Sequence, residues 1–211
     1  SVACWGGQHL GSGSQGSQST PVTTDLPEGR TAIDISSSDD HTCVVLDNGS
    51  VNCWGSGSYG RLGNGDTSNA LSPVYVLLGN NSATDVSTFW LGGCVVIENG
   101  SVMCWGGNDY GQTGNTDFNP DGFDQYDLFS TFVALPEGRT AVSIASGSSH
   151  NCAILDNGSV ACWGNDGPNA LYSPLGHGQA TNTDHTATPL FASLPDGRTA
   201  VAISAGGHRT C

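Results

Sequence analysis

The side chains best suited to specific chemistry in this sequence are its cysteines, of which there are 8. Six of them form three pairs in which the second cysteine follows the first by ten positions: Cys43 and Cys53, Cys94 and Cys104, and Cys152 and Cys162. Thiols in a regular pattern indicate either disulfide bonds or a metal site. The close C-x-x-C spacing of many zinc sites does not occur here, so the pattern favours disulfides.

The residues between each cysteine pair predict a β-hairpin. The three segments read CVVLDNGSVNC, CVVIENGSVMC and CAILDNGSVAC, apolar on both sides of an Asp/Glu-Asn-Gly turn. With a three-residue turn and a left-handed Gly49, Leu46 faces Ser50. Counting outward from there places Cys43 opposite Cys53, at the Cα separation that a disulfide requires. Each such bridge is expected to contribute about 2.5 to 3 kcal/mol to stability.

Regular disulfides persist in oxidising compartments, which predicts that the protein is secreted or lies at the cell surface. The composition argues against two other classes of function, nucleic-acid binding and membrane insertion. Lysine is absent and 5 Arg oppose 19 acidic residues, for a net charge of -14, so nucleic acid would be repelled. No apolar run reaches the length of a membrane-spanning helix, so membrane insertion is not expected.

Four asparagines stand in Asn-x-Ser sequons, which accept N-linked glycans in secreted eukaryotic proteins: Asn48, Asn80, Asn99 and Asn157. Three of them belong to the hairpin turns, where Asn-Gly is also the most favourable turn chemistry and the serine simply starts the next strand. Asn80 has no such explanation. For the turn asparagines, glycosylation and turn formation remain alternatives.

An acidic insertion, NTDFNPDGFDQYD, contains the one pattern that suggests a cofactor. Asp117, Asn119, Asp121 and Gly122 follow the spacing of oxygen ligands in a calcium loop. The acidic residue expected at the twelfth position is missing, because Leu128 stands there. Since Asn-Pro-Asp-Gly is also a favourable turn, an acidic surface loop without calcium is the alternative.

Catalysis finds little support in the histidines. His41 and His150 occupy one position of a repeated motif, but the second copy reads LGGC there and the last copy has Arg209. A residue replaced so freely is expected to form hydrogen bonds at a strand end rather than to transfer protons. No nucleophile with a base and no pair of carboxylates stands out, so the chain is not expected to be an enzyme.

These residues are positioned by an internal repeat. The tripeptide CWG recurs at Cys4, Cys53, Cys104 and Cys162, which divides a single domain of residues 1–211 into approximate repeats 1–43, 44–94, 95–152 and 153–211. Each complete hairpin spans a junction between these repeats. A second signature, LPEGRTA or LPDGRTA, precedes the first, third and fourth cysteines of the upstream series and is lost around residues 77–84.

The block GRTAxxIxxxxxHxCxxLDNGSVxCWG, followed by GxxxxGxxG at residues 55–63 and 106–114, resembles the regulator of chromosome condensation repeat. In that family each repeat supplies one four-stranded blade of a β-propeller, which implies an all-β chain of about four blades of 49–59 residues. The repeated tryptophans Trp5, Trp54, Trp105 and Trp163 are then expected to pack between blades. The founding member's nucleotide exchange and chromatin docking are not carried over, because this chain lacks a basic patch.

The two ends of the chain align with halves of one hairpin. Cys4 corresponds to Cys53, and Cys211 corresponds to Cys43. Either the ends meet and close a four-bladed ring with a Cys4–Cys211 disulfide, or the chain is part of a larger propeller or repeat array in which both cysteines pair elsewhere. The second alternative is favoured, because the family normally uses more blades.

The function expected from these observations is a non-enzymatic structural scaffold. It would be a segment of a secreted or cell-surface repeat protein, with a filament as one such assembly, and its partners would be other protein subunits or copies of itself. The alternative is a secreted propeller module that binds a protein or glycan ligand through its variable loops.

Overall fold

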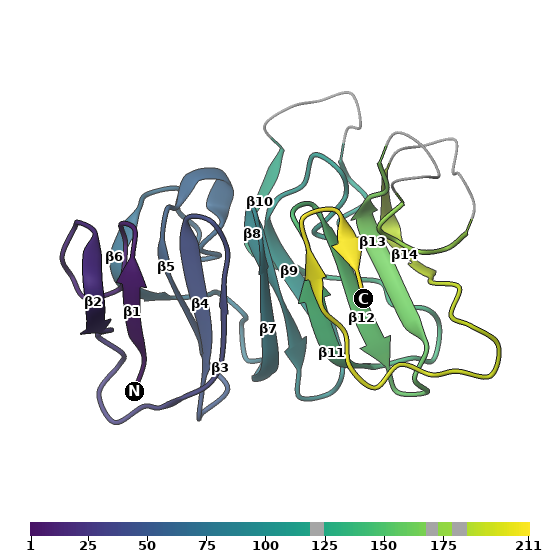
Figure 1. Cartoon of the computed structure of the whole chain (residues 1–211), viewed down its shortest axis with the longest axis horizontal. Coiled ribbons are helices and arrows are strands. Elements are labelled where there is room, and N and C mark those ends of the chain that lie inside the picture. Colours follow the sequence, from purple (N-terminus) through teal and green to yellow (C-terminus); the bar gives the residue numbers. More distant parts are fainter. Residues whose placement is uncertain (119–124, 168–172, 179–184) are drawn as a thin grey trace.

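The computed structural model of the chain describes residues 1–118, 125–167, 173–178 and 185–211. Three complete four-stranded antiparallel sheets follow one another, and a two-stranded sheet flanks them at each end (Figure 1). In each complete sheet the strands lie in sequence order, as in a propeller blade. The predicted all-β fold of repeated blades is therefore confirmed. The described residues contain one helical segment, the 3-10 turn η1 (Ser58–Gly60), and no helix able to cross a membrane.

The blades are named in chain order. The first blade contains β3 (Ala32–Ser37), β4 (His41–Leu46), β5 (Val51–Gly55) and β6 (Ala70–Tyr75). The second contains β7 (Ala83–Phe89), β8 (Gly92–Ile97), β9 (Val102–Gly107) and β10 (Tyr126–Phe132). The third contains β11 (Ala141–Ser146), β12 (His150–Leu155), β13 (Val160–Asn165) and β14 (His185–Phe191). Each blade begins at the alanine of the GRTA signature or its equivalent, so the cysteine hairpin forms the two central strands.

The cysteine pairs form disulfides in the register expected from the hairpin turn. The N–H of Leu46 donates to the carbonyl O of Ser50 at 2.8 Å, and Gly49 has a φ of 77°. Outward from this turn, Cys43 faces Cys53 across β4 and β5. All three bridges, Cys43–Cys53, Cys94–Cys104 and Cys152–Cys162, have Cα separations of 4.0 to 4.1 Å. Their sulfur atoms lie in the core, because the six cysteines are buried.

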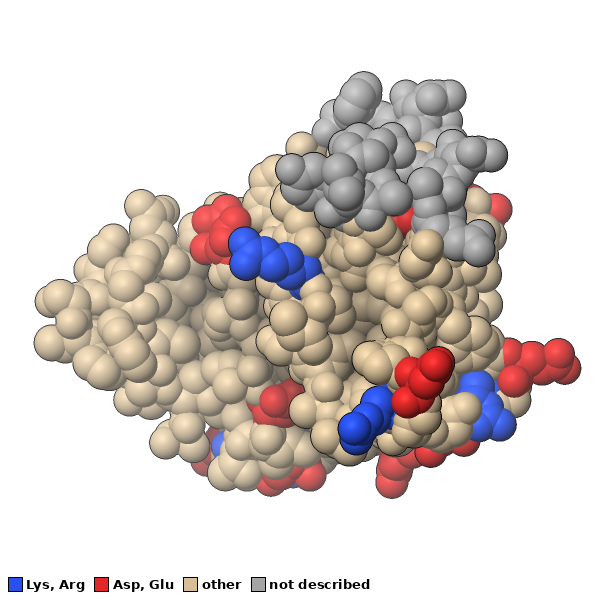
Figure 2. All heavy atoms as spheres, turned by 45° about the vertical axis from the view of Figure 1, so that its right-hand side comes forward, with Lys and Arg blue, Asp and Glu red and all other residues tan. Residues whose placement is uncertain are grey.

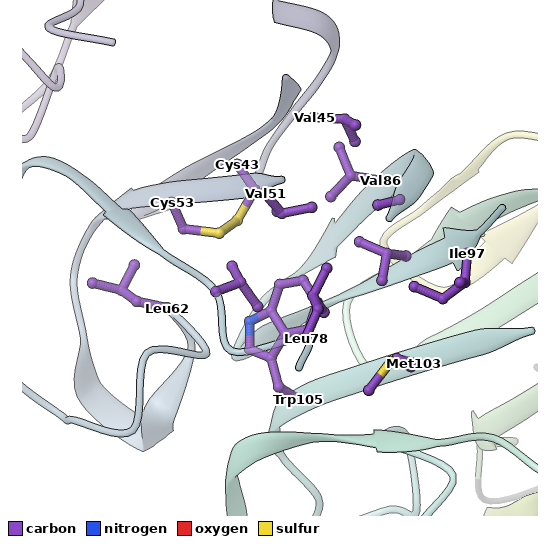
Figure 3. Close-up of a cluster of buried hydrophobic side chains, with 13 residues drawn as sticks. Cys43, Val45, Val51, Cys53, Leu62, Leu78, Val86, Ile97, Met103 and Trp105 are labelled. Carbon is purple, nitrogen blue, oxygen red and sulfur yellow. A yellow bond between two sulfur atoms is a disulfide. The ribbon is translucent and has the colours of Figure 1, made fainter. Parts of the chain in front are cut away.

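The hydrophobic core lies between the blades rather than within one of them. Figure 3 shows the cluster between the first and second blades, in which the Cys43–Cys53 disulfide lies with Leu62, Leu78 and Trp105. A second cluster surrounds Trp163 between the second and third blades. Because one sheet cannot cover its own face, each blade depends on its neighbour for burial. Trp105 and Trp163 are fully buried in these two clusters, and Trp54 is fully buried in a third cluster with Val2 and Leu46.

Polar side chains on the first strands fix neighbouring blades relative to each other. Strand β3 contacts β7, and β7 contacts β11. The N–H of Val86 donates to Asp34 Oδ2 at 2.8 Å, and the N–H of Ile144 donates to Asp85 Oδ2 at 2.9 Å. Burial raises the pKa of the Asp85 carboxyl, and the hydrogen bond from Ile144 opposes that shift. The same contact thus recurs at two successive blade junctions.

The two-stranded sheets at the ends do not meet, so the predicted alternative of a closed four-bladed ring is wrong for this structure. One consists of β1 (Ala3–Gly6) and β2 (Gln18–Thr23), and the other of β15 (Ala205–Gly206) and β16 (Arg209–Thr210). They lie at opposite ends of the array, separated by the three complete blades (Figure 1). Cys4 and Cys211 are accordingly not joined: Cys4 is half-buried and Cys211 is exposed, and both are free thiols in this structure. The exposed Trp5 likewise lacks the packing of its three equivalents.

Candidate functional site

The described parts of the loops that connect the third strand to the fourth strand of each blade share one edge of the array, which we call the loop edge. These parts comprise residues 56–69, 108–118 with 125, and 166–167 with 173–178. The cysteine hairpin turns lie at the opposite edge, the hairpin edge, because each third strand runs from its hairpin turn to its loop (Figure 1). The strands have similar lengths in all three blades, whereas the loops differ in length and sequence. Variable loops on a constant frame are typical of binding surfaces.

A tryptophan of the following blade fixes the stem of the first loop and of the second. Nε1 of Trp105 donates to the carbonyl O of Arg61 at 2.9 Å, and Nε1 of Trp163 donates to that of Gln112 at 3.0 Å. Gly63 has a φ of 62°, and a Cβ added to it would lie 2.9 Å from the Trp105 ring. A side chain does not fit there, so the loop stem and the indole are closely matched.

Aromatic contacts attach the loops to the outer strand of the next blade. Tyr59 packs edge-on against Tyr126, the first residue of β10, with ring centroids 6.2 Å apart. Phe118 packs in the same way against His185, the first residue of β14, at 5.4 Å. The first and second loops are therefore each attached to the blade that follows them.

Carboxylates organise the first two loops. Asp66 Oδ1 accepts hydrogen bonds from the N–H groups of Thr67 and Ser68 at 2.6 and 3.1 Å. The hydrogen bonds from Ser68 and then from Thr67 lower the pKa of the Asp66 carboxyl. In the second loop, Asp127 accepts from Thr113 Oγ1 at 2.6 Å and from an asparagine amide at 3.0 Å. Both carboxylates hold loop backbone and side chains in place.

The third loop contains a partly buried group of serine, aspartate and histidine. Ser173 Oγ donates to Asp166 Oδ1 at 2.6 Å, and His177 Nε2 lies 2.7 Å from Asp166 Oδ2. The carboxylate therefore stands between the other two side chains. In a serine nucleophile the hydroxyl contacts the histidine instead, so this arrangement is one of structural support.

The structure describes the predicted calcium ligands only in part. The N–H of Asp117 donates to Asn115 Oδ1 at 3.0 Å in the second loop. Asn119 and Asp121 lie outside the described residues. Within the described ranges, no group of three or more His, Cys, Asp or Glu side chains is arranged to hold a metal ion. Calcium binding at this loop stays a prediction.

The two repeat histidines are buried links to the next sheet. His41 Nε2 donates to the carbonyl O of Gly92 at 3.1 Å, and its Nδ1 accepts from Ser38 Oγ at 2.8 Å. His150 Nε2 lies 2.9 Å from Thr210 Oγ1. Burial lowers the pKa of His41 to about 3 and that of His150 to about 4. Both imidazoles are neutral near pH 7, and they serve as hydrogen-bonding spacers between sheets.

The second blade fills the equivalent space with different residues. Phe89 stands at the position of Ser38, and Gly92 stands at the position of His41. A Cβ added to Gly92 would lie 2.5 Å from the Phe89 ring, which is fully buried. The phenyl ring thus takes the room that an imidazole uses in the first blade, which explains why the histidine is missing there.

The four sequon asparagines are exposed. Asn48 Oδ1 accepts from Ser50 Oγ at 2.7 Å, and Asn157 Oδ1 accepts from Ser159 Oγ at the same distance. The turn hypothesis accounts for these contacts, since an asparagine side chain that bonds two residues ahead stabilises a turn. Asn80 lies in the segment before β7. Glycosylation stays a prediction for all four.

Charged side chains are sparse, and arginines stand beside acidic residues (Figure 2). On the hairpin edge, Arg30 lies 3.6 Å from Asp47, and Arg139 lies 3.5 Å from Asp156. These pairs are partly exposed, so each contributes at most about 1 kcal/mol. They tie the GRT segment of a blade to the hairpin turn of the same blade.

Sequence comparison assigns these features to a known repeat. Models of the regulator of chromosome condensation (RCC1) repeat match residues 32–61, 48–88 and 141–167. The matched segments contain two of the disulfide hairpins and the tryptophans Trp54 and Trp163. Residues 32–88 and 141–167 are thus similar to the RCC1 repeat.

Two curated proteins illustrate the relationship. The chain is 28% identical to human E3 ubiquitin-protein ligase HERC2, over 96% of this chain and 4% of that protein. It is 27% identical to the ultraviolet-B receptor UVR8 of Arabidopsis thaliana, over 86% of this chain and 40% of that protein. The chain therefore spans less than half the length of either relative.

Solved structures confirm the fold. Human WBSCR16 superposes with a TM-score of 0.76 at 21% identity, over 97% of this chain and 50% of that one. Yeast RCC1 superposes with a TM-score of 0.75 at 18% identity, over 92% of this chain and 44% of that one. The likeness establishes a β-propeller architecture.

Sequence reasoning missed the contacts between blades that hold the loops. The glycines of the GxxxxGxxG segment were a signal, because a left-handed residue such as Gly63 marks a close approach. The identity of the approaching group, Trp105, depends on which face of the next blade is presented. The pairing of Arg30 with Asp47 was likewise absent from the expectations, although both belong to repeated signatures.

Proposed function

We propose that this array of RCC1 repeats is a non-catalytic protein-binding module whose partner contacts the loop edge. The observation that carries the proposal is the difference between the fixed stems of the first two loops and the exposed tip of the first. Stems are fixed by Trp105 and Trp163, whereas the tip of the first loop is exposed at Asp66, Thr67, Ser68 and Asn69. A fixed stem reduces the entropy that a loop loses when a partner binds its tip.

An extracellular location is part of the proposal. Three buried disulfides support it, because cytosolic thiols are kept reduced. The names of the relatives refer to ubiquitin transfer and ultraviolet-B reception, and neither activity is proposed for this chain, which covers only part of those proteins.

The partner that we favour is another subunit of a secreted or cell-surface scaffold, or a second copy of this chain. The absence of lysine and the local crosslinks support a durable assembly, since they reduce protease sites and restrict unfolding. A soluble protein or a glycan that binds the loops is the alternative.

A photo-crosslinking residue tests whether a partner protein contacts the loop edge. Placed at Thr67, it is expected to give discrete adducts in the native extracellular material. The matched control carries the same residue at Asp196, which is exposed beyond the third blade. Adducts from Thr67 alone support the proposal, whereas equal yields from both positions, or none from Thr67, would overturn it.

A further inference from the structure

Two of the three blades close the same small gap on the hairpin edge with an arginine. Arg30 of the first blade reaches Asp47 in its hairpin turn, and Arg139 of the third blade reaches Asp156 in the same way. The N–O distances are 3.6 and 3.5 Å. The chain itself therefore shows how a guanidinium is accommodated between the GRT segment and the hairpin carboxylate.

The second blade keeps the backbone frame of this arginine site. The N–H of Glu98 donates to the carbonyl O of Ser82 at 2.8 Å. In the first blade, the N–H of Asp47 donates to the carbonyl O of Thr31 at 2.9 Å. Hence Glu98 presents a carboxylate from the same turn position as Asp47, on a side chain that is one methylene longer.

The arginine itself is missing from the second blade. Asn81 stands where the first blade has Arg30. Its amide Nδ2 donates to the carbonyl O of Leu78 at 2.8 Å, so the side chain serves its own turn. In the described part of the chain, Glu98 forms no ion pair.

A hollow of about 330 Å³ occupies this position. It is lined by Asn80, Asn81, Ser82, Ile97, Glu98 and Asn99. Amide and hydroxyl oxygens around one carboxylate are acceptors, and a guanidinium offers five N–H donors in a planar fork. The lining therefore complements the group that fills the equivalent place in the first and third blades.

We propose that this hollow, the arginine-acceptor site, binds an arginine side chain of a partner protein. The net charge of -14 favours approach of a basic segment, and the two internal pairs favour arginine over lysine. This inference rests on the protein-binding function proposed above and adds a second contact, on the edge opposite the loops. The site lies on the hairpin edge, so it can be tested apart from the loops.

Titration of the full chain with the peptide acetyl-Gly-Arg-Gly-amide, followed by NMR, tests the site. The backbone amide signals of Glu98 and Asn99 are expected to shift, while that of Asp47, whose carboxylate is already paired, stays unchanged. Glu98→Gln is expected to weaken the peptide about two- to fivefold, the range of an exposed ion pair. Asn81→Arg supplies the guanidinium from the chain itself and is expected to abolish the shifts.

The controls separate this site from the general function. A peptide with citrulline in place of arginine is expected to bind as weakly to the native chain as the arginine peptide binds to Glu98→Gln. Equal shifts at Asp47 and Glu98, shifts that survive Asn81→Arg, or a native glycan on Asn80 or Asn99 that blocks the peptide would each overturn the site. Adducts from Thr67 report on the loop edge and do not depend on these variants.

Discussion

At the scale of single residues, one space between neighbouring blades is filled in three ways. The first blade uses Ser38 with His41, and the second uses Phe89 with Gly92. In the third blade His150 lies against a glycine, because a Cβ added to Gly147 would meet its ring. Volume is retained while polarity changes, as expected of a packing position rather than of a catalytic one.

The buried histidines predict that acid weakens the fold. Their folded-state pKa values, about 3 for His41 and about 4 for His150, lie below the unfolded value of 6.5. The unfolded chain therefore binds protons first, and the stability that neutral histidine provides above pH 6.5 is lost as the pH falls. At pH 5 each histidine is expected to cost about 2 kcal/mol, measurable as a lower free energy of unfolding in urea.

A variant that copies the second blade provides the control. Ser38→Phe combined with His41→Gly replaces the titrating pair by the residues that fill the same space in the second blade. Its stability is expected to fall less than that of the native chain between pH 7 and pH 5, by about 2 kcal/mol. An unchanged pH dependence would show that His41 does not account for the acid sensitivity.

Gly63 gives a second prediction at this scale. Gly63→Ala is expected to destabilise the fold because it combines a left-handed backbone with a Cβ 2.9 Å from the Trp105 ring. Gly29→Ala is the matched control, since Gly29 has a φ of 72° and open space around it. Urea unfolding is expected to show that the change at Gly63 costs about 1 to 3 kcal/mol more than the change at Gly29. Equal losses of unfolding free energy in the two variants would mean that the contact with the Trp105 ring does not contribute and that backbone strain alone causes the effect.

At the scale of elements, the disulfide hairpin is the rigid centre of each blade. Replacement of both Cys94 and Cys104 by alanine is expected to lower the free energy of unfolding by about 2.5 to 3 kcal/mol, because the open loop gains entropy in the unfolded chain. Cys211→Ser, which removes an unbonded thiol, is expected to leave the denaturation midpoint unchanged. Equal midpoints for the native chain and the double variant would contradict a stabilising role of the bridge.

The loop and the following blade form a second coupled element. Trp105→Phe keeps most of the buried ring but removes the hydrogen bond to the carbonyl O of Arg61. The loss is expected to be about 1 kcal/mol, with faster hydrogen exchange at the amide of Gly63, which donates to Gly60 in the loop stem. Exchange that accelerates equally in the third blade would indicate general loosening instead of local release.

At the scale of the whole molecule, the hairpins and disulfides followed from sequence because their partners lie within one short segment. The turn at Gly49 fixes the register, and the register then selects Cys53 as the partner of Cys43. The blade architecture also followed, through the repeated signatures and the family resemblance. Local geometry, repeated three times, leaves few alternatives.

Contacts between blades could not be predicted in the same way. His41 is hydrogen-bonded to Gly92, and Trp105 to Arg61, although the partners are 51 and 44 residues apart in the sequence. Which side chains meet there depends on how the sheets stack, and a repeat pattern does not specify that stacking. For the same reason, sequence alone did not show that Cys4 and Cys211 lie at opposite ends of the array.

The central claim is a stack of blades in which each complete blade carries its own buried disulfide. Mass spectrometry of the native protein, alkylated after denaturation but before reduction, tests it most directly. The six cysteines of the three blades are expected to remain unmodified, with linked peptides that join Cys43 to Cys53, Cys94 to Cys104 and Cys152 to Cys162. Alkylation of these six cysteines without reduction, or linkage between different blades, would contradict both the stapled architecture and the extracellular location inferred from it.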